Sequence, residues 1–295
     1  MIEIDFLTKF NRPVVLAMGF FDCVHTGHRA LLTKCAALAR AAGAAAAATT
    51  FCNNAYKRFN PDSKLIYTYA ERLCLFAEAG MDACVPFKFD AAFKQTDKRE
   101  FLDLLLRNLD IKAAVCGYDY LFGSRGGGDA QFLREYFSAR GVAVHIERPV
   151  TYNGERVSST LVKETLSAGN IEKANILLAR PYFMQGSVER GRGVGASISA
   201  PTANLKYSKD KLLAKAGVYS TRTTLDGNTY KSVTSIGPKP TFDEPSITVE
   251  TFIDGVSSAL YGKTLRVEFF KYLRPLRKFP SPSALSLQIK ADLEA

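Results

Sequence analysis

The sequence predicts an α/β Rossmann-like unit with a parallel sheet in residues 1–180, followed by an antiparallel β-barrel or sandwich with a C-terminal helix in residues 181–295. Three observations support this organisation. Short apolar segments alternate with amphipathic segments up to about residue 180, which favours a parallel sheet covered by helices. From residue 182 onward, short alternating segments are separated by turn residues, as in antiparallel β-structure. The length of 295 residues also suits two domains better than one.

In the first half, the apolar run at 14–17 contains β-branched residues and predicts a buried strand. Residues 29–43 then have apolar side chains at helical spacing, and Gly43 can end that helix. The alternation continues in the same way. Further strands are predicted at 44–51, 83–87, 113–116 and 142–146, and further helices at 71–79, 100–109, 131–140 and 171–178.

In the second half, the dipeptide Asp226–Gly227 lies between two β-rich segments and predicts a hairpin turn. Two more strands are predicted at 248–253 and 265–270, and an amphipathic helix at 283–293. The boundary between the two units is expected near Arg180–Pro181, after the helix at 171–178.

The composition bounds the class of protein. The chain has 47% hydrophobic residues and a net charge of +10, but no run of about 20 apolar residues and no basic leader segment. The six cysteines lack the spacing of a zinc site, so reduced thiols and a cytoplasmic location are expected, with no membrane partner. No nucleic-acid motif is present, and polyanionic small ligands explain the positive charge equally well.

Two of the three histidines, His25 and His28, follow the first predicted strand in the segment GFFDCVHTGH. They lie where that strand turns into a helix. A helix N-terminus offers free N–H groups and a partial positive charge, and therefore suits a phosphate. Two imidazoles three residues apart can donate hydrogen bonds to phosphate oxygens while charge develops. Ordinary polar residues at a loop edge are the alternative interpretation. Cys23, inside this turn, is not expected to be a nucleophile, because phosphate chemistry needs no covalent intermediate here.

Two further loops are expected at the same edge of the sheet. The first, GYDYLFGSRGGGD at 117–129, is rich in glycine and carries Asp119, Phe122 and Arg125. The second, VSSTLVK at 157–163, contains hydroxyls that can cap a helix, and Lys163 lies one turn further on. A surface loop and a plain helix cap are the alternatives.

In the second half, the segment GRGVGASISAPTANL at 191–205 combines several glycines with Pro-Thr-Ala-Asn. Thr202 and Asn204 offer neutral oxygens that suit Mg²⁺ or a phosphate. Glu250 lies in the middle of a predicted strand, where it shares one face with Phe252. A carboxylate at the edge of a pocket could act as a general base. A turn-rich hairpin and a surface carboxylate are the alternatives.

Taken together, these segments resemble the prokaryotic bifunctional riboflavin kinase/FMN adenylyltransferase family, also called FAD synthetases. The resemblance covers nearly the whole chain. It includes GFFDCVHTGH, GYDYLFG, VSSTLVK, PTANL, VETFI, LYGKTLRVEFF and LRPLRKF in the family's order. The resemblance implies a nucleotidyltransferase domain followed by a six-stranded kinase barrel. It also implies two reactions that use ATP with Mg²⁺: riboflavin to FMN at the barrel, and FMN to FAD at the first domain.

The resemblance implies roles for individual residues. His25, His28 and Glu250 would be catalytic. Thr202 and Asn204 would also hold the metal ion. The residues implied to bind flavin are Asp119, Phe122, Arg125 and Arg274. The residues implied to bind ATP or its phosphates are Gly19, Phe21, Asp22, Gly27, Ser159, Thr160, Lys163, Gly191, Gly195, Thr202 and Asn204.

The chain departs from the family pattern at a few positions. Cys23 replaces a glycine, and Lys163 replaces an arginine, which loses the bidentate fork. The segment TFCNNAY has Asn53 where a Pro-His pair is common, and Ser199 and Ala200 replace Gly-Phe before PTAN.

Two alternatives stay open at this point. In one, only one half is active and the other half binds flavin without turnover. In the other, the barrel is an OB-like nucleic-acid-binding module. The lack of alternating aromatic and basic residues on one strand weighs against the second alternative. The oligomeric state does not follow from the sequence.

Overall fold

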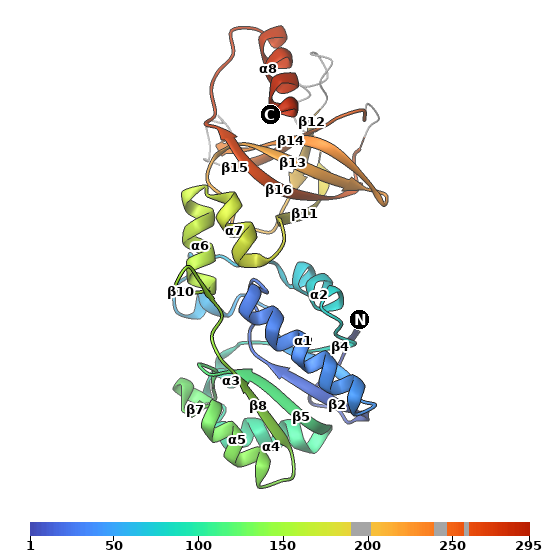
Figure 1. Ribbon diagram of the computed structural model, residues 1–295, viewed down its shortest axis with the longest axis vertical. Coiled ribbons are helices and arrows are strands. Elements are labelled where there is room, and N and C mark those ends of the chain that lie inside the picture. The colour runs from blue at the N-terminus through green and yellow to red at the C-terminus, as the bar shows by residue number, and fades with distance from the viewer. Residues whose placement is uncertain (190–201, 239–246, 257–259) are drawn as a thin grey trace. The chain divides into compact units, whose positions relative to one another are not determined.

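The computed structural model describes residues 1–295 except 190–201, 239–246 and 257–259 (Figure 1). The chain divides into two compact units, Met1–Ser159 and Thr160–Ala295. The expected boundary of the functional domains at residue 180 stays a prediction. In the part of the chain that the structure describes, no helix has both the length and the apolar character needed to cross a membrane.

The first unit is built on a parallel six-stranded sheet of order β1-β4-β3-β2-β5-β8, which confirms the predicted α/β class. The chain moves from β2 toward β3 and β4, and then returns to β5 on the other side of β2. The carboxyl ends of β2 and β5 therefore flank a topological switch point, where α/β sheets bind ligands. The strands are β1 (Ile2–Glu3), β2 (Phe10–Met18), β3 (Ala45–Phe51), β4 (Ala83–Phe87), β5 (Leu109–Gly117) and β8 (Ala143–Glu147).

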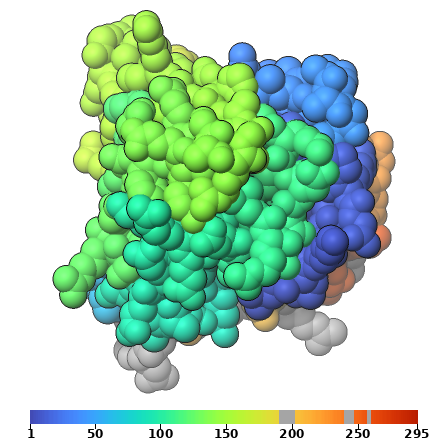
Figure 2. Space-filling view, turned by 90° about the horizontal axis from the view of Figure 1, so that it is seen from below, coloured from blue at the N-terminus to red at the C-terminus, as the bar shows by residue number. Residues whose placement is uncertain are grey.

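Helices cover this sheet, and three of them, α1, α4 and α5, lie against its strands in Figure 1. The helix α2 begins with a capping box, in which Thr68 and Glu71 each bond the other's backbone N–H. The helices are α1 (Thr26–Ala41), α2 (Tyr69–Glu78), α3 (Ala91–Gln95), α4 (Lys98–Asn108) and α5 (Ala130–Ser138). Figure 2 shows a face on which segments of this unit, coloured blue to lime green, pack closely.

The core of the first unit explains the alanine-rich strand β3. Ala45 and Ala47 are buried in the same cluster as Leu16, Phe101 and Phe137. Small side chains in the middle of the sheet leave room for the large side chains of α4 and α5, so the volumes complement one another. The sequence predicts a glycine-rich loop at residues 117–129. The segment contains a small hairpin of β6 (Leu121–Phe122) and β7 (Gly128–Asp129), around the short helix η2 (Ser124–Gly126).

The second unit is a closed antiparallel barrel of order β11-β12-β15-β14-β13-β16, which decides for a barrel over a sandwich. Asp226 and Gly227 have φ of 48° and 84° and form the predicted turn between β13 and β14. Inside the barrel, the hydroxyls of Thr221, Ser232 and Thr234 are buried and bond one another. The strands are β11 (Tyr182–Glu189), β12 (Thr202–Lys206), β13 (Gly217–Leu225), β14 (Asn228–Pro238), β15 (Ile247–Ile253) and β16 (Thr264–Arg274).

Three helices accompany the barrel: α6 (Ser159–Ala168), α7 (Ile171–Leu178) and α8 (Pro282–Glu294). Asn175 fixes α7 to the barrel, because its side chain donates to the Phe269 carbonyl at 2.8 Å and accepts from the Tyr182 N–H at 2.7 Å. The C-terminal helix α8, expected from the sequence, packs Ile289 against Phe252 of β15.

Candidate active site

The turn after β2 places the two histidines at the first residues of α1. His25 is the N-cap, and its Nδ1 accepts the backbone N–H of His28 at 3.1 Å. The imidazole rings are stacked, with centroids 3.7 Å apart and planes at 13°. Gly27 permits this arrangement, because a Cβ there would lie only 3.1 Å from Cε1 of His25. The local structure therefore holds both rings at the helix start, as the sequence predicts.

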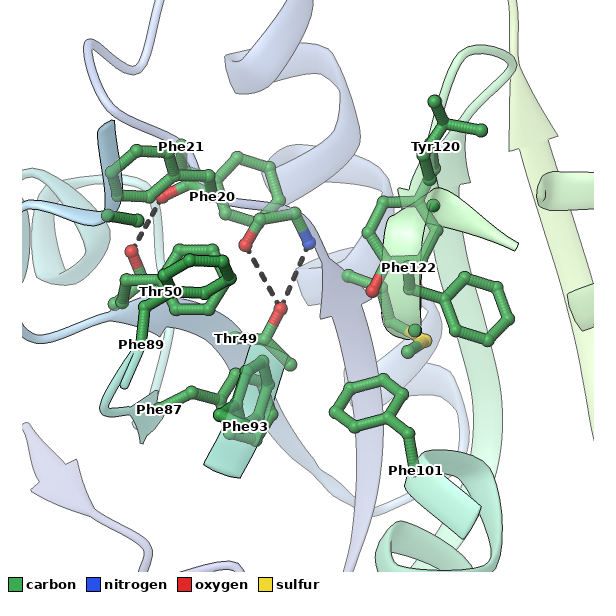
Figure 3. Close-up of a pocket in the computed structure, with 18 of the residues that line it drawn as sticks. Phe20, Phe21, Thr49, Thr50, Phe87, Phe89, Phe93, Phe101, Tyr120 and Phe122 are labelled. Atoms are coloured by element: carbon green, nitrogen blue, oxygen red, sulfur yellow. Dashed lines mark hydrogen bonds between the residues drawn. The ribbon is translucent and has the colours of Figure 1, made fainter. Parts of the chain in front are cut away.

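The turn that delivers these histidines is strained and well supported. Phe21 and Val24 have φ of 54° and 47°, values that bulky and β-branched residues rarely adopt. The Thr49 hydroxyl accepts the Gly19 N–H at 2.9 Å and donates to the Gly19 carbonyl at 3.1 Å (Figure 3). Thr50 donates to the Phe20 carbonyl at 2.6 Å. Strain of this kind persists only where surrounding contacts determine the backbone, and it is common at functional sites.

Both histidines are neutral at pH 7. Burial lowers the pKa of His25 to about 4, opposed by a hydrogen bond with its own backbone and assisted by the positive charge of Arg156. Burial, followed by the neighbouring His25, lowers the pKa of His28 well below its usual value. Since Nδ1 of His25 accepts a hydrogen bond, the hydrogen-bond pattern assigns the proton to Nε2. His25 thus presents a neutral N–H donor.

A cavity of about 890 Å³ opens beside His28. It lies at the carboxyl ends of four strands, and its lining comes from residues 18–21, 49–59, 87–101 and 117–126 together with His28 and Leu31. Aromatic side chains dominate this lining, and Figure 3 shows Phe87, Phe93 and Phe101 along one side of the site and Tyr120 and Phe122 along another. The cavity can therefore take a flat aromatic ligand at one end and phosphate at the other.

Six of the site residues expected from the sequence line this one cavity. They are Gly19, Phe21, His28, Asp119, Phe122 and Arg125. Asp119 and Arg125 are exposed, whereas Phe122 is buried among aromatic neighbours. Asp119 also accepts a hydrogen bond from Arg156 at 3.2 Å, which ties the loop after β5 to strand β10 (Glu155–Arg156).

Other assigned residues lie outside the cavity lining. Asp22 is buried and accepts the Ile66 N–H at 3.2 Å. Ser159 lies at the start of α6, with its hydroxyl 3.4 Å from Sγ of the buried Cys23. Thr160 is exposed and Lys163 is half-buried on the same helix. The side chain of Asn53 bonds the backbone N–H and carbonyl of Phe89, and so joins the ends of two strands.

Two groups of side chains offer possible metal ligands, one at the histidine turn and one in the barrel. One nitrogen from each of His25 and His28 and Sγ of Cys23 lie within 4.8 Å of one another. Sulfur and imidazole ligands do not suit Mg²⁺, which prefers oxygen. In the barrel, Thr202 and Asn204 supply the oxygen donors that Mg²⁺ prefers.

Those barrel residues lie together. Asn204 of β12 is directly opposite Glu250 of β15, and Thr202 is opposite Phe252. Opposite residues share a face of the sheet, so all four point to the same side. Their neighbours Ala203 and Thr251 are buried in the barrel interior, which places this polar set on the outer face. Gly191, Gly195, Ser199 and Ala200 lie outside the described residues.

The guanidinium of Arg274 is already paired with a carboxylate of the protein. Its guanidinium donates to both carboxylate oxygens of Asp292, with the shortest distance 2.7 Å, and so fixes α8 to β16. Its role in flavin binding stays a prediction.

Sequence reasoning missed several residues of this site. Thr49 and Thr50 support the turn, and Phe87, Phe89 and Phe93 line the cavity. The phenylalanines were detectable, since three of them follow closely at the end of the predicted strand 83–87. The threonines gave no signal, because only the parallel pairing of β2 with β3 brings them to the turn.

The comparisons with known proteins identify the family. A model of FAD synthetase matches residues 7–161, and a model of riboflavin kinase matches residues 178–295. With the fold and the paired histidines, these matches define a flavin-modifying transferase whose first unit is of the nucleotidyltransferase type. The chain belongs to the bifunctional riboflavin kinase/FMN adenylyltransferase family, and riboflavin, FMN and ATP are the substrates that the family implies. Of the alternatives left open by the sequence, this assignment supports an enzyme and not a nucleic-acid-binding module.

Individual relatives agree with this assignment. The chain is 30% identical to the bifunctional riboflavin kinase/FMN adenylyltransferase of Pseudomonas fluorescens, over 97% of this chain and 92% of that protein. It is 29% identical to the Bacillus subtilis enzyme of the same name, over 94% and 90%. A solved structure from Streptococcus pneumoniae, titled as a macrolide-efflux protein, is 28% identical and covers 100% of this chain and 98% of its own, with a TM-score of 0.88.

The lowered pKa of His25 predicts a specific pH dependence of stability. The ring has a pKa of about 4 in the folded protein and 6.5 as its ordinary value. The unfolded chain therefore binds the proton more tightly than the folded protein does. The neutral ring makes its full contribution to the free energy of unfolding above pH 6.5, and this contribution is lost as the pH falls toward 4. Between pH 7 and pH 5 the loss is about 2 kcal/mol.

Urea unfolding at these two pH values checks this expectation. His25→Asn keeps an N-cap side chain but removes the titration, so the loss between pH 7 and pH 5 becomes smaller by about that amount. Identical pH dependence in wild type and variant would contradict the assignment.

Proposed function

We propose that the first unit transfers AMP from ATP to the phosphate of FMN at the His25–His28 pair. The single observation that carries this proposal is the stacked, neutral pair of imidazoles at the start of α1, beside the cavity. Backbone N–H groups at that helix start favour a phosphate, and the histidines add donors to the charge that develops during transfer. Gly19, Phe21, Asp22 and Gly27 shape the turn that presents them.

The flavin ring of FMN is proposed to occupy the aromatic part of the cavity. Rings offered by Phe122, Tyr120 and Phe93 suit offset or edge contacts with a flat ligand. Asp119 offers a hydrogen-bond acceptor at the mouth, and Arg125 offers a cation for phosphate. Ser159, Thr160 and Lys163 at the start of α6 are proposed to bind phosphates of ATP, through hydroxyl donors and one positive charge.

The barrel is proposed to transfer the γ-phosphate of ATP to the ribityl hydroxyl of riboflavin. Glu250 accepts the proton of that hydroxyl, and its register opposite Asn204 supports this role. Thr202 and Asn204 fit Mg²⁺, because hydroxyl and amide oxygens are hard ligands. When bound, Mg²⁺ neutralises phosphate charge during transfer. Gly191 and Gly195 are proposed phosphate contacts of the same site, and the cytoplasmic location stays a prediction.

One incubation tests both reactions. The purified full-length protein is supplied with riboflavin, ATP and Mg²⁺, and the flavins are separated over time. FMN that appears first and is then converted to FAD is the expected result. FMN alone, or FAD only from added FMN, would show that only one half is active.

Replacement of His28 by alanine separates the two activities. In this variant the backbone N–H of residue 28 can still donate to Nδ1 of His25, so the helix start is kept. Only the imidazole donor of His28 is lost. FAD formation from FMN should fall by about 10²–10³, the usual effect of one lost donor to developing charge. FMN formation from riboflavin should be unchanged.

His145→Ala is the matched control, since His145 lies on β8 and does not line the cavity. Steady-state rates of both reactions decide the point. Equal loss of both activities in folded His28→Ala would overturn the assignment of adenylylation to this unit.

The charge of Lys163 gives a second prediction. If Lys163 binds a phosphate of ATP, Lys163→Ala should raise the KM for ATP in FAD formation, whereas Lys163→Arg should keep or improve activity because guanidinium binds phosphate with two donors. Lys173→Ala, on the neighbouring helix α7, is the control. Equal KM values in all of these proteins would show that Lys163 is only a surface charge.

Removal of the proposed base gives the third prediction. Glu250→Gln keeps the shape of the side chain, so riboflavin and ATP should still bind, but FMN formation should fall by about 10²–10⁴. FAD formation from supplied FMN should be nearly unchanged. Glu268→Gln makes the same chemical change on β16 and should leave the kinase rate intact. A wild-type kinase rate in folded Glu250→Gln would leave Glu250 with a structural role only.

A further inference from the structure

Arg72 is the largest fully buried side chain among the described residues, with an exposed fraction of 0%. It lies on α2, outside the motifs that carry the family resemblance. Its guanidinium donates to the Phe51 carbonyl at 2.7 Å, to the Thr50 hydroxyl, and to the Phe20 carbonyl at 3.5 Å. Buried charges are costly unless they are paired and hydrogen-bonded, so this placement needs an explanation.

The acceptors of Arg72 belong to the walls of the active-site cavity. Phe20, Thr50 and Phe51 all line it. The Thr50 hydroxyl, which accepts from Arg72, donates in turn to the Phe20 carbonyl at 2.6 Å. The guanidinium also lies over the Phe20 ring, 5.1 Å from its centroid. One side chain of α2 therefore connects the end of β3 with the turn after β2.

That turn is the strained segment that ends at His25. Phe20 directly precedes Phe21, whose φ is 54°. Asp22 follows, is 1% exposed, and attracts the charge of Arg72. Burial lowers the pKa of Arg72, opposed by the charge of Asp22, but an arginine remains protonated at neutral pH. Arg72 thus supplies both hydrogen bonds and charge compensation to the residues that lead into the catalytic turn.

We propose that Arg72 is a positioning residue for adenylylation, which holds the Phe20–Asp22 turn and thereby sets the position of His25 and His28 relative to the cavity. The inference rests on the proposed function of that site. It goes beyond it by assigning to a buried residue on another helix the alignment of the catalytic pair. A small misplacement of reacting groups, of about 1 Å, can cost about 10²-fold in rate.

The variant Arg72→Met tests the proposal in the full-length protein, because it keeps length and removes both charge and donors. The kcat for FAD formation from FMN should fall about 10–100-fold. Riboflavin phosphorylation in the same preparation should be unchanged. Arg72→Lys restores the charge and one point of hydrogen bonding, and should recover part of the lost kcat.

A matched control separates positioning from general destabilisation. Leu75 lies on the same helix, is also fully buried, and is not among the residues that line the cavity. Leu75→Ala should lower the thermal midpoint but leave kcat for FAD formation unchanged at a temperature where the protein is folded. If Arg72→Met does not fold, Thr50→Val removes the hydroxyl that accepts from Arg72 and donates to the Phe20 carbonyl, and should lower kcat as well.

Each result decides the proposal. A wild-type kcat in folded Arg72→Met, or in folded Thr50→Val where Arg72→Met does not fold, would overturn it. An equal loss of kcat in Leu75→Ala, or no recovery in Arg72→Lys, would also overturn it. Absence of FAD formation by the wild-type protein would instead overturn the proposed function of the first unit, so the two failures are distinguishable.

Discussion

The hydrogen bond from the His28 backbone N–H to Nδ1 of His25 is the interaction on which the proposed adenylylation site depends. It caps α1, fixes the protonation of His25 and orients its ring in one step. Because burial keeps both rings neutral, neither needs a counter-charge, and the pair can face anionic phosphates with N–H donors. Forming this turn costs free energy, because polar groups are buried and the backbone is strained. The strained Phe21 and Val24 persist because Thr49, Thr50 and Arg72 bond the adjoining backbone from a neighbouring strand and helix.

The topology explains why these supports meet. In this parallel sheet, β2 pairs with β3 on one side and with β5 on the other. The carboxyl ends of the strands therefore bring the histidine turn, the threonines of β3 and the loop with Asp119 to one edge. The aromatic side chains after β4 and β5 close the cavity with apolar surface, which favours a flat ligand and strengthens the polar interactions at its other end.

The sequence predicts the fold class, most of the strands and helices, and the position of the histidine pair, because these depend on local periodicity and on turn chemistry. Val14–Ala17 and Gly43 are examples in which the pattern and the structure agree. The turn supports could not be predicted. Thr49, Thr50 and Arg72 are separated from the turn in sequence, and only strand pairing and burial bring them together. The closed barrel also follows from pairing of β11 with β16, which no local pattern shows.

Under the proposed roles, the two units solve two different problems of phosphate chemistry. In adenylylation, the attacking group is a phosphate of FMN, which is already largely ionised at neutral pH, since the second pKa of a phosphate monoester is about 6. Such a site needs donors and positive potential, and neutral imidazoles at a helix start supply them without competing for the proton. In the kinase reaction, the attacking group is a hydroxyl that must lose its proton. A general base then helps, and the carboxylate of Glu250, opposite Asn204, is the proposed one. The different residue types of the two sites follow from the charge of their nucleophiles.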